Sequence, residues 1–143
     1  MDNITETIKR RLKVLWNITS TPGQGATRLP FSEEGKQAAK YLLNEMQRAG
    51  LYAWIDTVGN VRGMLPATLD NTDKDNVKTI LMGSHYDTVK NGGEFDGAAG
   101  VICALSVVEY IKANCPVRKH NLEIIAFNDE EGCMFGSGCL GSK

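Results

Sequence analysis

Apolar residues recur at intervals of three and four positions in three stretches of the chain, and this spacing predicts helices that each bury one face. The second stretch begins after Ser32, a residue type that often caps helix N-termini, and the third ends before Pro116. Shorter apolar stretches without this spacing predict strands. The predicted helices cover residues 4–18, 33–49 and 97–114, and the predicted strands cover 51–57, 61–65, 77–83 and 122–127.

The order of these elements indicates an α/β fold. The helix over 97–114 connects the last two predicted strands, and such a unit pairs its strands in parallel through a right-handed crossover. Both of these strands are almost continuously apolar, as strands covered on both faces are. Residues 70–76 are polar or charged and predict a solvated turn before the strand over 77–83.

The composition is that of one folded domain. The chain has 143 residues, of which 42% are hydrophobic and 23% charged, and its net charge is −1, so we expect a packed core. The longest basic run, Lys9-Arg10-Arg11, is too short for a nucleic-acid footprint. No apolar stretch approaches the roughly 18 residues of a membrane span, and the polar, acidic N-terminus does not have the pattern of a signal peptide. We therefore expect a cytoplasmic protein without nucleic-acid or membrane partners.

Four cysteines occur, and none lies in a Cys-x-x-Cys pair, which argues against a structural zinc site. We expect reduced thiols, because a chain of this size with an ordinary core does not need disulfides. Cys103 falls on an apolar helix and is expected in the core. Two interpretations stay open for Cys133 and Cys139, which flank an acidic cluster: small buried side chains, or soft metal ligands.

Three clusters of polar side chains stand where apolar stretches break into glycine-containing loops. The first holds His85 and Asp87, the second Asp96, and the third Glu130 and Glu131. Ligands of open α/β sheets gather beyond the carboxyl ends of strands, and imidazole with carboxylates is a donor set that divalent cations bind. Because the clusters follow neighbouring strands of one parallel unit, the sequence predicts one shared metal site.

Each cluster alone also has an ordinary structural explanation. His85 and Asp87 could form a surface ion pair, Asp96 could be the N-cap of the helix that follows it, and Glu130 and Glu131 could belong to a solvated acidic turn. In the functional interpretation, the Asp87 carboxylate accepts the second ring N–H of the imidazole. Asp96 bridges two cations, and of the two glutamates one binds metal while the other is a general base.

Residues 136–141 match the pattern G-x-G-x-x-G of dinucleotide-binding loops. That fingerprint directly follows a strand and opens a helix, with an acidic residue about 20 positions further on. Here eight residues separate Phe127 from Gly136, and two residues follow the motif. We therefore do not expect nucleotide binding.

The motifs around the three clusters are more specific than the clusters themselves. They read G-S-H-Y-D-T-V at 83–89, G-G-E-F-D-G at 92–97, E-E-G at 130–132 and F-G-S-G at 135–138, with T-R-L at 27–29 and D-T-V-G-N at 56–60. Together they resemble the amidase/hydantoinase/carbamoylase family, a branch of the dinuclear metallopeptidase superfamily. This branch includes N-carbamoyl-L-amino acid hydrolases, allantoate amidohydrolases and metal-type β-ureidopropionases. Related peptidases usually have a longer interval between His85 and Asp96, so the amidohydrolase branch is favoured.

The resemblance implies a three-layer, aminopeptidase-like (phosphorylase/hydrolase-like) catalytic domain with a mostly parallel sheet, of which residues 1–143 are the N-terminal part. It implies two divalent ions (Zn²⁺, Mn²⁺, Ni²⁺ or Co²⁺), with His85 on the first, Glu131 on the second and Asp96 bridging both. Glu130 would be the general base, and Asp87 would orient His85. The implied reaction is hydrolysis of a linear carbon–nitrogen bond in an N-carbamoyl amino acid or ureido substrate, by water that Glu130 deprotonates.

The chain also departs from the family. Met134 precedes Phe135 where members often have an Arg nearby, and members are much longer, with a further His for each metal and a dimerisation domain. The other histidine here, His120, precedes the last predicted strand, at the end away from the site. We therefore expect the dimerisation domain and C-terminal part to be absent. The chain alone should be inactive, bind metal weakly or not at all, and self-associate by a contact other than the family homodimer.

Three hypotheses for the function follow. The first is part of a metal-dependent amidohydrolase, and the second is a non-catalytic metal-binding or interaction module derived from such an enzyme. The third is a peptidase of the same superfamily. The sequence identifies neither the substrate within the carbamoyl and ureido class nor the metal.

Overall fold

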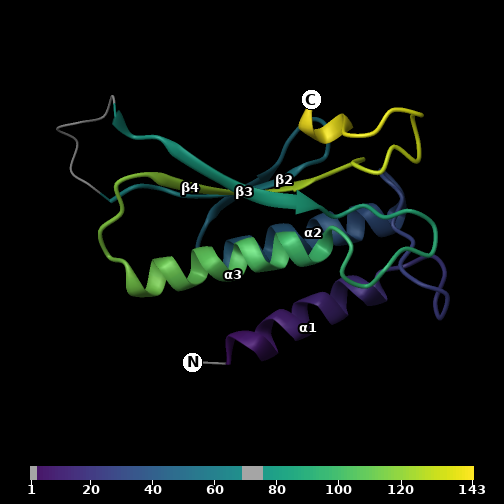
Figure 1. The fold of residues 1–143 in the computed structure, drawn as a ribbon, viewed down its shortest axis with the longest axis horizontal. Coiled ribbons are helices and arrows are strands. Elements are labelled where there is room, and N and C mark those ends of the chain that lie inside the picture. Colours follow the sequence, from purple (N-terminus) through teal and green to yellow (C-terminus); the bar gives the residue numbers. More distant parts are fainter. Residues whose placement is uncertain (1–2, 69–75) are drawn as a thin grey trace.

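The fold is a four-stranded sheet with three helices packed on one side of it. The computed structural model describes residues 3–68 and 76–143. The strands lie in the order β1-β2-β4-β3 across the sheet, and the helices lie below it in the view of Figure 1. The helices are α1 (Ile4–Asn17), α2 (Glu33–Arg48) and α3 (Ala98–Asn114), and the strands are β1 (Tyr52–Ile55), β2 (Val61–Leu65), β3 (Thr79–His85) and β4 (Asn121–Phe127).

The mixed α/β class and the parallel unit are confirmed, but the prediction of a mostly parallel sheet is wrong for these strands. β3 and β4, connected by α3, pair in parallel, whereas β1 with β2 and β2 with β4 pair antiparallel. β1 and β2 are joined by a tight turn, in which the Gly59 N–H donates to the Asp56 carbonyl at 3.1 Å. A parallel pair needs a far longer crossover than this turn.

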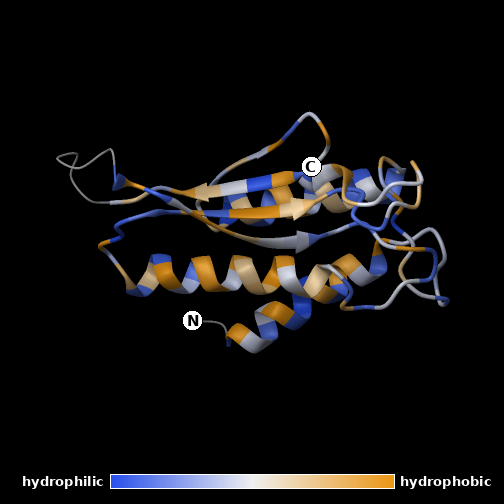
Figure 2. Cartoon of the chain, turned by 45° about the horizontal axis from the view of Figure 1, so that its top comes forward, coloured by the Kyte–Doolittle hydropathy of each residue, from blue (hydrophilic) through white to orange (hydrophobic). Residues whose placement is uncertain are grey.

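The three helices share one core with the sheet. α2 packs on β1 and β2, and α3 packs on β3 and β4. α3 is apolar around most of its circumference (Figure 2), because α1 covers part of the surface that the sheet does not. Of the residues that the apolar spacing places on the buried side of α3, Val101, Leu105 and Val108 are buried, and Ile111 is partly buried against the core. Ser32 caps α2, since its side chain accepts the Gly35 N–H at 3.0 Å.

The other side of the sheet carries no α-helix within residues 3–68 and 76–143, and the three-residue helix Leu140–Ser142 lies above it in Figure 1, so the described chain shows two layers of the expected three. Leu122 and Ile124 of β4 join the core beneath the sheet, and strand alternation turns Glu123 and Ile125 to the open side. All of these β4 residues are buried, as expected. β3 is an edge strand, with Ile80 and Leu81 on it 47% and 52% exposed, so the expectation of cover on both faces is wrong there.

Three smaller expectations have separate outcomes. β3 starts two residues later than predicted and ends at His85, because its register pairs Thr79 with Asn121 and His85 with Phe127. All four cysteines are free but exposed. Cys103 is therefore not in the core, and it shares the uncovered face of α3 with Val107. The turn predicted over 70–76 lies, apart from its last residue, outside the described residues. Within the described ranges, no helix has the length and apolar character to cross a membrane.

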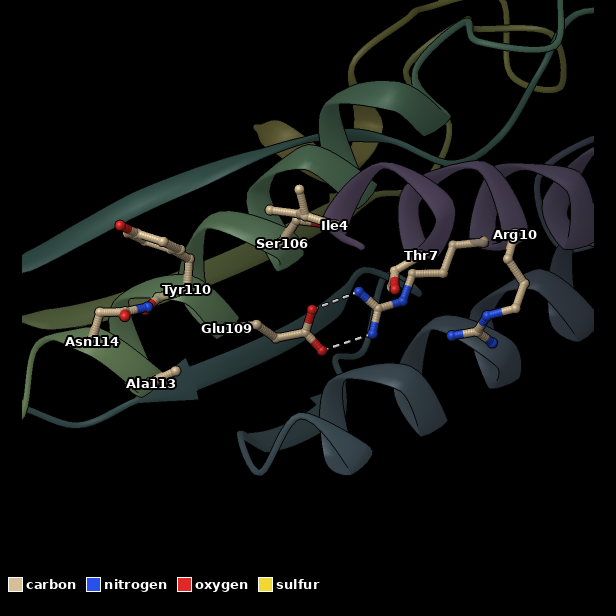
Figure 3. Close-up of a pocket in the computed structure, with 9 residues that line it drawn as sticks. Ile4, Thr7, Arg10, Ser106, Glu109, Tyr110, Ala113 and Asn114 are labelled. Atoms are coloured by element: carbon tan, nitrogen blue, oxygen red, sulfur yellow. Dashed lines mark hydrogen bonds and ion pairs between the residues drawn. The ribbon is translucent and has the colours of Figure 1, made fainter. Parts of the chain in front are cut away.

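A buried ion cluster connects all three helices, and no sequence pattern indicated it. The Arg11 side chain, 5% exposed, donates from Nε to Glu45 at 2.8 Å and from both terminal nitrogens to Glu109 at 2.7 Å. The Glu109 contacts border a pocket of about 370 Å³ between α1 and α3 (Figure 3). Arg48 adds a contact to Glu45 at 2.8 Å. Although burial opposes its ionisation, hydrogen bonds from Arg11 and Arg48 hold the pKa of Glu45 below its ordinary value.

Arg11→Met should lower the free energy of unfolding by about 3–5 kcal/mol, because it leaves a buried carboxylate without its main partner. Urea unfolding followed by circular dichroism measures the change. Lys9→Met on the same helix is the matched control. It removes an exposed ion pair to Glu6 at 3.0 Å and should cost less than about 1 kcal/mol. Equal losses in the two variants would contradict the importance of the buried cluster.

We also expect the chain to self-associate through the edge of β3. An edge strand presents unpaired backbone groups, and the exposed side chains of Ile80 and Leu81 add apolar surface there. Leu81→Lys should therefore lower the mean mass that light scattering reports across a concentration series. Val107→Lys, on the exposed face of α3, should not. A wild-type chain that stays monomeric at every concentration would disprove the expectation.

Candidate metal centre

The carboxyl ends of β3 and β4 bring the site residues to one edge of the sheet. The two strands are parallel, and His85 pairs with Phe127. The pairing continues for one more residue, because the Tyr86 N–H donates to the Phe127 carbonyl at 3.0 Å. The loop over 128–131 therefore starts beside His85.

His85 has an oxygen atom near each ring nitrogen. Its Nδ1 lies 3.1 Å from the main-chain carbonyl oxygen of Asp87, and a proton on Nδ1 makes this contact a hydrogen bond that orients the ring. Nε2 then carries the lone pair, and it lies 3.7 Å from Asp96 and 3.8 Å from Glu130. Gly97 leaves room for the ring, since a Cβ there would lie 2.5 Å from the imidazole.

The Asp87 carboxylate holds the two strand-end loops together. It is fully buried, and its oxygens accept the backbone N–H groups of Glu130 at 3.1 Å and Glu131 at 3.2 Å. We had expected this carboxylate to accept the His85 N–H, but it lies 3.7 Å from Nδ1. The main-chain carbonyl of Asp87 is in hydrogen-bonding range of the ring instead. Burial also excludes the alternative of a surface ion pair.

Glu130 and Glu131 form a group of possible metal ligands with His85. One ligand atom from each of the three residues lies within 4.8 Å of the others. Burial raises the pKa of Glu131, and repulsion from Asp96 and Glu130 raises it further. The nearby His85 opposes this shift. Asp129, beside them, is fully buried, whereas the Glu130 side chain is 40% exposed, so burial argues against a solvated turn at Asp129 and leaves that alternative open for Glu130. A donor set of imidazole and crowded carboxylates fits a divalent cation.

Asp96 lies at the border of this group. Its side chain is 51% exposed, and His85 is its contact in the site. The alternative of a helix cap is wrong, because Gly97, with a φ of 63°, is the N-cap of α3 and no side chain caps that helix. The bridging role of Asp96 stays a prediction.

Comparison with known proteins identifies the family of this chain. The sequence profile of peptidase family M28 matches residues 60–143, more than half of the chain and the part that contains all five candidate residues. The chain belongs to peptidase family M28.

Similar proteins include amidohydrolases. The chain is 38% identical over 138 residues to an N-carbamoyl-L-amino acid amidohydrolase of Geobacillus stearothermophilus, and 35% identical over 134 residues to allantoate deiminase 1 of Glycine max. A crystal structure of a hydantoinase/carbamoylase family amidase from Burkholderia ambifaria matches with a TM-score of 0.86 at 29% identity. The resemblance seen in the motifs is thereby confirmed.

The matches cover nearly all of this chain but a minor part of the relatives. They span 96%, 92% and 98% of the 143 residues, in the order given above. They span 32%, 26% and 33% of the three relatives. The matched part of the chain therefore spans between a quarter and a third of the length of these relatives.

A buried arginine packs behind the candidate site. Arg28, 1% exposed, donates to the carbonyl oxygens of Tyr86 at 3.1 Å and Leu15 at 2.8 Å. Its backbone N–H donates to Thr88 Oγ1 at 2.8 Å. Burial lowers the pKa of Arg28 to about 10, and the negative charge of Asp87 opposes the shift. Arg28 thus connects the residues on both sides of Asp87 to the end of α1. In the sequence, Arg28 belongs to the T-R-L motif at 27–29.

The glycine-rich stretch packs against the site loop. Backbone N–H groups of residues 139, 140 and 141 donate to the carbonyl oxygens of residues 130, 129 and 128, in that order, at 3.0–3.1 Å. A Cβ at Gly138 would lie 2.7 Å from the Glu130 oxygen, and one at Gly141 would lie 2.5 Å from the Asn128 oxygen. The G-x-G-x-x-G pattern therefore permits a close approach of two backbones, and a three-residue helix, Leu140–Ser142, ends the chain.

Three other potential ligands lie apart from the candidate site. His120 precedes β4, at the end of that strand away from the site as expected, and its Nδ1 accepts the Lys78 N–H at 3.4 Å. Cys133 and Cys139 are exposed, so the interpretation as small buried side chains is wrong. Neither thiol joins the ligand group formed by the described residues.

Glu131→Gln should stabilise the metal-free chain and weaken its binding of Zn²⁺ or Mn²⁺. The folded-state pKa of Glu131 is raised, so its ionisation opposes folding above that pKa, and the cost falls as the pH drops toward the unfolded-state value. In EDTA we expect a melting temperature about 3 °C above wild type at pH 7, for a gain of about 1 kcal/mol. At pH 5 the difference should be smaller.

Thermal unfolding with and without metal measures both effects. Glu33→Gln is the matched control, because this residue is exposed and pairs with Lys36 on α2, and it should change neither quantity. A Glu131→Gln variant that binds Zn²⁺ as tightly as wild type would contradict a ligand role for Glu131.

Proposed function

We propose that this chain is part of the catalytic domain of a metal-dependent amidohydrolase that cleaves the linear carbon–nitrogen bond of N-carbamoyl amino acids or related ureido compounds. The observation that carries the proposal is the arrangement around Asp87. Its carboxylate holds the backbone of Glu130 and Glu131 beside His85, so that an imidazole and two carboxylates lie within 4.8 Å. The names of the similar relatives support the substrate class.

His85, Asp96 and Glu131 are the proposed metal ligands, on two divalent ions. Imidazole with carboxylates suits Zn²⁺, Mn²⁺, Ni²⁺ and Co²⁺, and the raised pKa of Glu131 fits a carboxylate whose favourable partner is a cation. When bound, such ions polarise the substrate carbonyl and make water more acidic.

Glu130 is the proposed general base. Its backbone N–H is fixed on Asp87, so its side chain extends from a rigid point, which favours a reproducible position for proton transfer. Glu130 takes a proton from the water that attacks the carbonyl carbon, and that proton becomes available to the nitrogen that leaves. Such bases contribute rate factors of about 10²–10⁴. Asp87 orients His85 through its main-chain carbonyl.

The match to an M28 peptidase profile favours peptide-bond hydrolysis as a second candidate. The short interval between His85 and Asp96 argues against it, since related peptidases usually have a longer one. A substrate panel separates the two: N-carbamoyl amino acids, a ureido compound and an aminoacyl peptide.

A chimera tests the proposed function. This chain replaces the matching 138 residues of the Geobacillus relative, and the product is assayed with Mn²⁺ or Zn²⁺. We expect hydrolysis of an N-carbamoyl amino acid, and a loss of at least about 10²-fold in Glu130→Gln. Lys90→Gln, an exposed residue of the loop after β3, should retain activity. A folded, metal-loaded chimera without activity on any carbamoyl or ureido substrate would overturn the proposal.

By itself, the 143-residue chain should show no measurable turnover of N-carbamoyl amino acids. Its ligand group contains one histidine, so a bound ion would keep few protein ligands and activate water poorly. Assays of the purified chain with Mn²⁺ or Zn²⁺ decide this point. Robust turnover that Glu130→Gln abolishes would show that these residues suffice for catalysis.

A further inference from the structure

Asp129 combines two unusual features in the loop that follows β4. Its φ is 57°, in the left-handed region that glycine, asparagine and aspartate enter more readily than other residues. Its side chain is fully buried, and neither carboxylate oxygen has a hydrogen-bond partner among the described residues. A buried carboxylate without partners is unfavourable, so no side-chain contact explains an aspartate at this position.

The backbone around Asp129 offers an explanation. A residue with positive φ followed by one without it can place successive N–H groups on one side of the chain, which makes a concave anion site called a nest. Glu130 has no positive φ, and the N–H groups of Glu130 and Glu131 meet the two oxygens of Asp87 at 3.1 and 3.2 Å. The Asp129 carbonyl oxygen accepts a hydrogen bond from the Leu140 N–H at 3.1 Å.

We propose that Asp129 is a positioning residue whose left-handed backbone conformation, rather than its charge, forms the nest that binds the Asp87 carboxylate. The nest places the backbone of Glu130 and Glu131 beside His85. The inference rests on the proposed function, because its consequence is a metal affinity.

Substitutions can separate the backbone conformation from the charge. Asp129→Gly and Asp129→Asn remove the carboxylate but keep access to positive φ. Asp129→Val removes the carboxylate and is strained there, because β-branched residues rarely adopt positive φ. The three variants lose the same charge and differ in the conformation that they tolerate.

Two measurements on the full 143-residue chain test the proposal: Zn²⁺ affinity by competition with a chromogenic chelator, and hydrogen exchange of the Glu130 and Glu131 amides without metal. Asp129→Gly and Asp129→Asn should bind Zn²⁺ within about threefold of wild type and keep both amides protected. Asp129→Val should bind at least about tenfold more weakly, or about 1.4 kcal/mol, and both amides should exchange faster. Asn91→Val, at a φ of 57° outside the ligand group, is the strain control and should change neither.

Each result has a defined meaning. Wild-type affinity and protected amides in Asp129→Val would overturn the proposal. Equal losses in Asp129→Asn and Asp129→Val would also overturn it, because the charge would then be the cause. Should Asp129→Val fail to fold, Asp129→Ala supplies the same comparison with a smaller expected loss. A wild-type chain that does not bind Zn²⁺ would agree with the weak binding expected of the isolated chain, and amide exchange alone would then decide the role of Asp129: protected amides in Asp129→Val would overturn the proposal.

Discussion

The hydrogen bonds from the backbone of Glu130 and Glu131 to the buried Asp87 carboxylate are the constraint on which the site depends. Bonds to an ionised acceptor are stronger than neutral ones, and away from water they are strengthened further. They connect the loop after β3 to the loop after β4, just beyond the last paired residues of both strands. The carbonyl oxygen of the same residue lies 3.1 Å from Nδ1 of His85, so Asp87 contacts an imidazole and the backbone of two glutamates together.

Around this connection, the site is supported mainly by main-chain groups. Arg28 binds carbonyl oxygens next to Asp87 and at the end of α1, and three N–H groups of the glycine-rich stretch bind the carbonyls of residues 128–130. The side chains that face the candidate centre are left with few partners of their own. Burial raises the pKa of Glu131, and repulsion from Asp96 and Glu130 raises it further. Carboxylates that are crowded on a rigid backbone destabilise the metal-free site, and the same arrangement is preorganised to bind a cation.

Membership of family M28 and similarity to carbamoylases and allantoate deiminases agree with this chemistry. The motifs around His85, Asp96 and Glu130 were specific because their spacing is required by particular contacts in the structure. Asp87, two positions after His85, carries the carboxylate that binds the backbone of the next loop. Gly97 leaves room for the His85 ring and Gly138 for the Glu130 carbonyl, where a Cβ would clash. The similarity covers a minor part of each relative, so the activity remains a proposal for this chain.

Much of the local structure was predictable from the sequence. The spacing of apolar residues located all three helices within one residue, because burial of one helix face repeats with the period of the helix. Short apolar stretches located β2 and β4 equally well. The three polar clusters were predictable as one site, since a helix between two strands implies parallel pairing and a common edge. The motifs also indicated the family, which the comparisons confirmed.

Tertiary structure alone decided which groups meet. The place of β2 between β1 and β4 made the sheet mostly antiparallel, and periodicity carries no information on strand order. The Arg11 cluster joins residues up to 98 positions apart, and its members look like ordinary surface charges along the chain. The partner of the Asp87 carboxylate proved to be a backbone and not the imidazole, and Cys103 proved exposed. Such contacts depend on how separate elements pack against one another. The pattern of residue types along the chain indicates only which face of each element is buried.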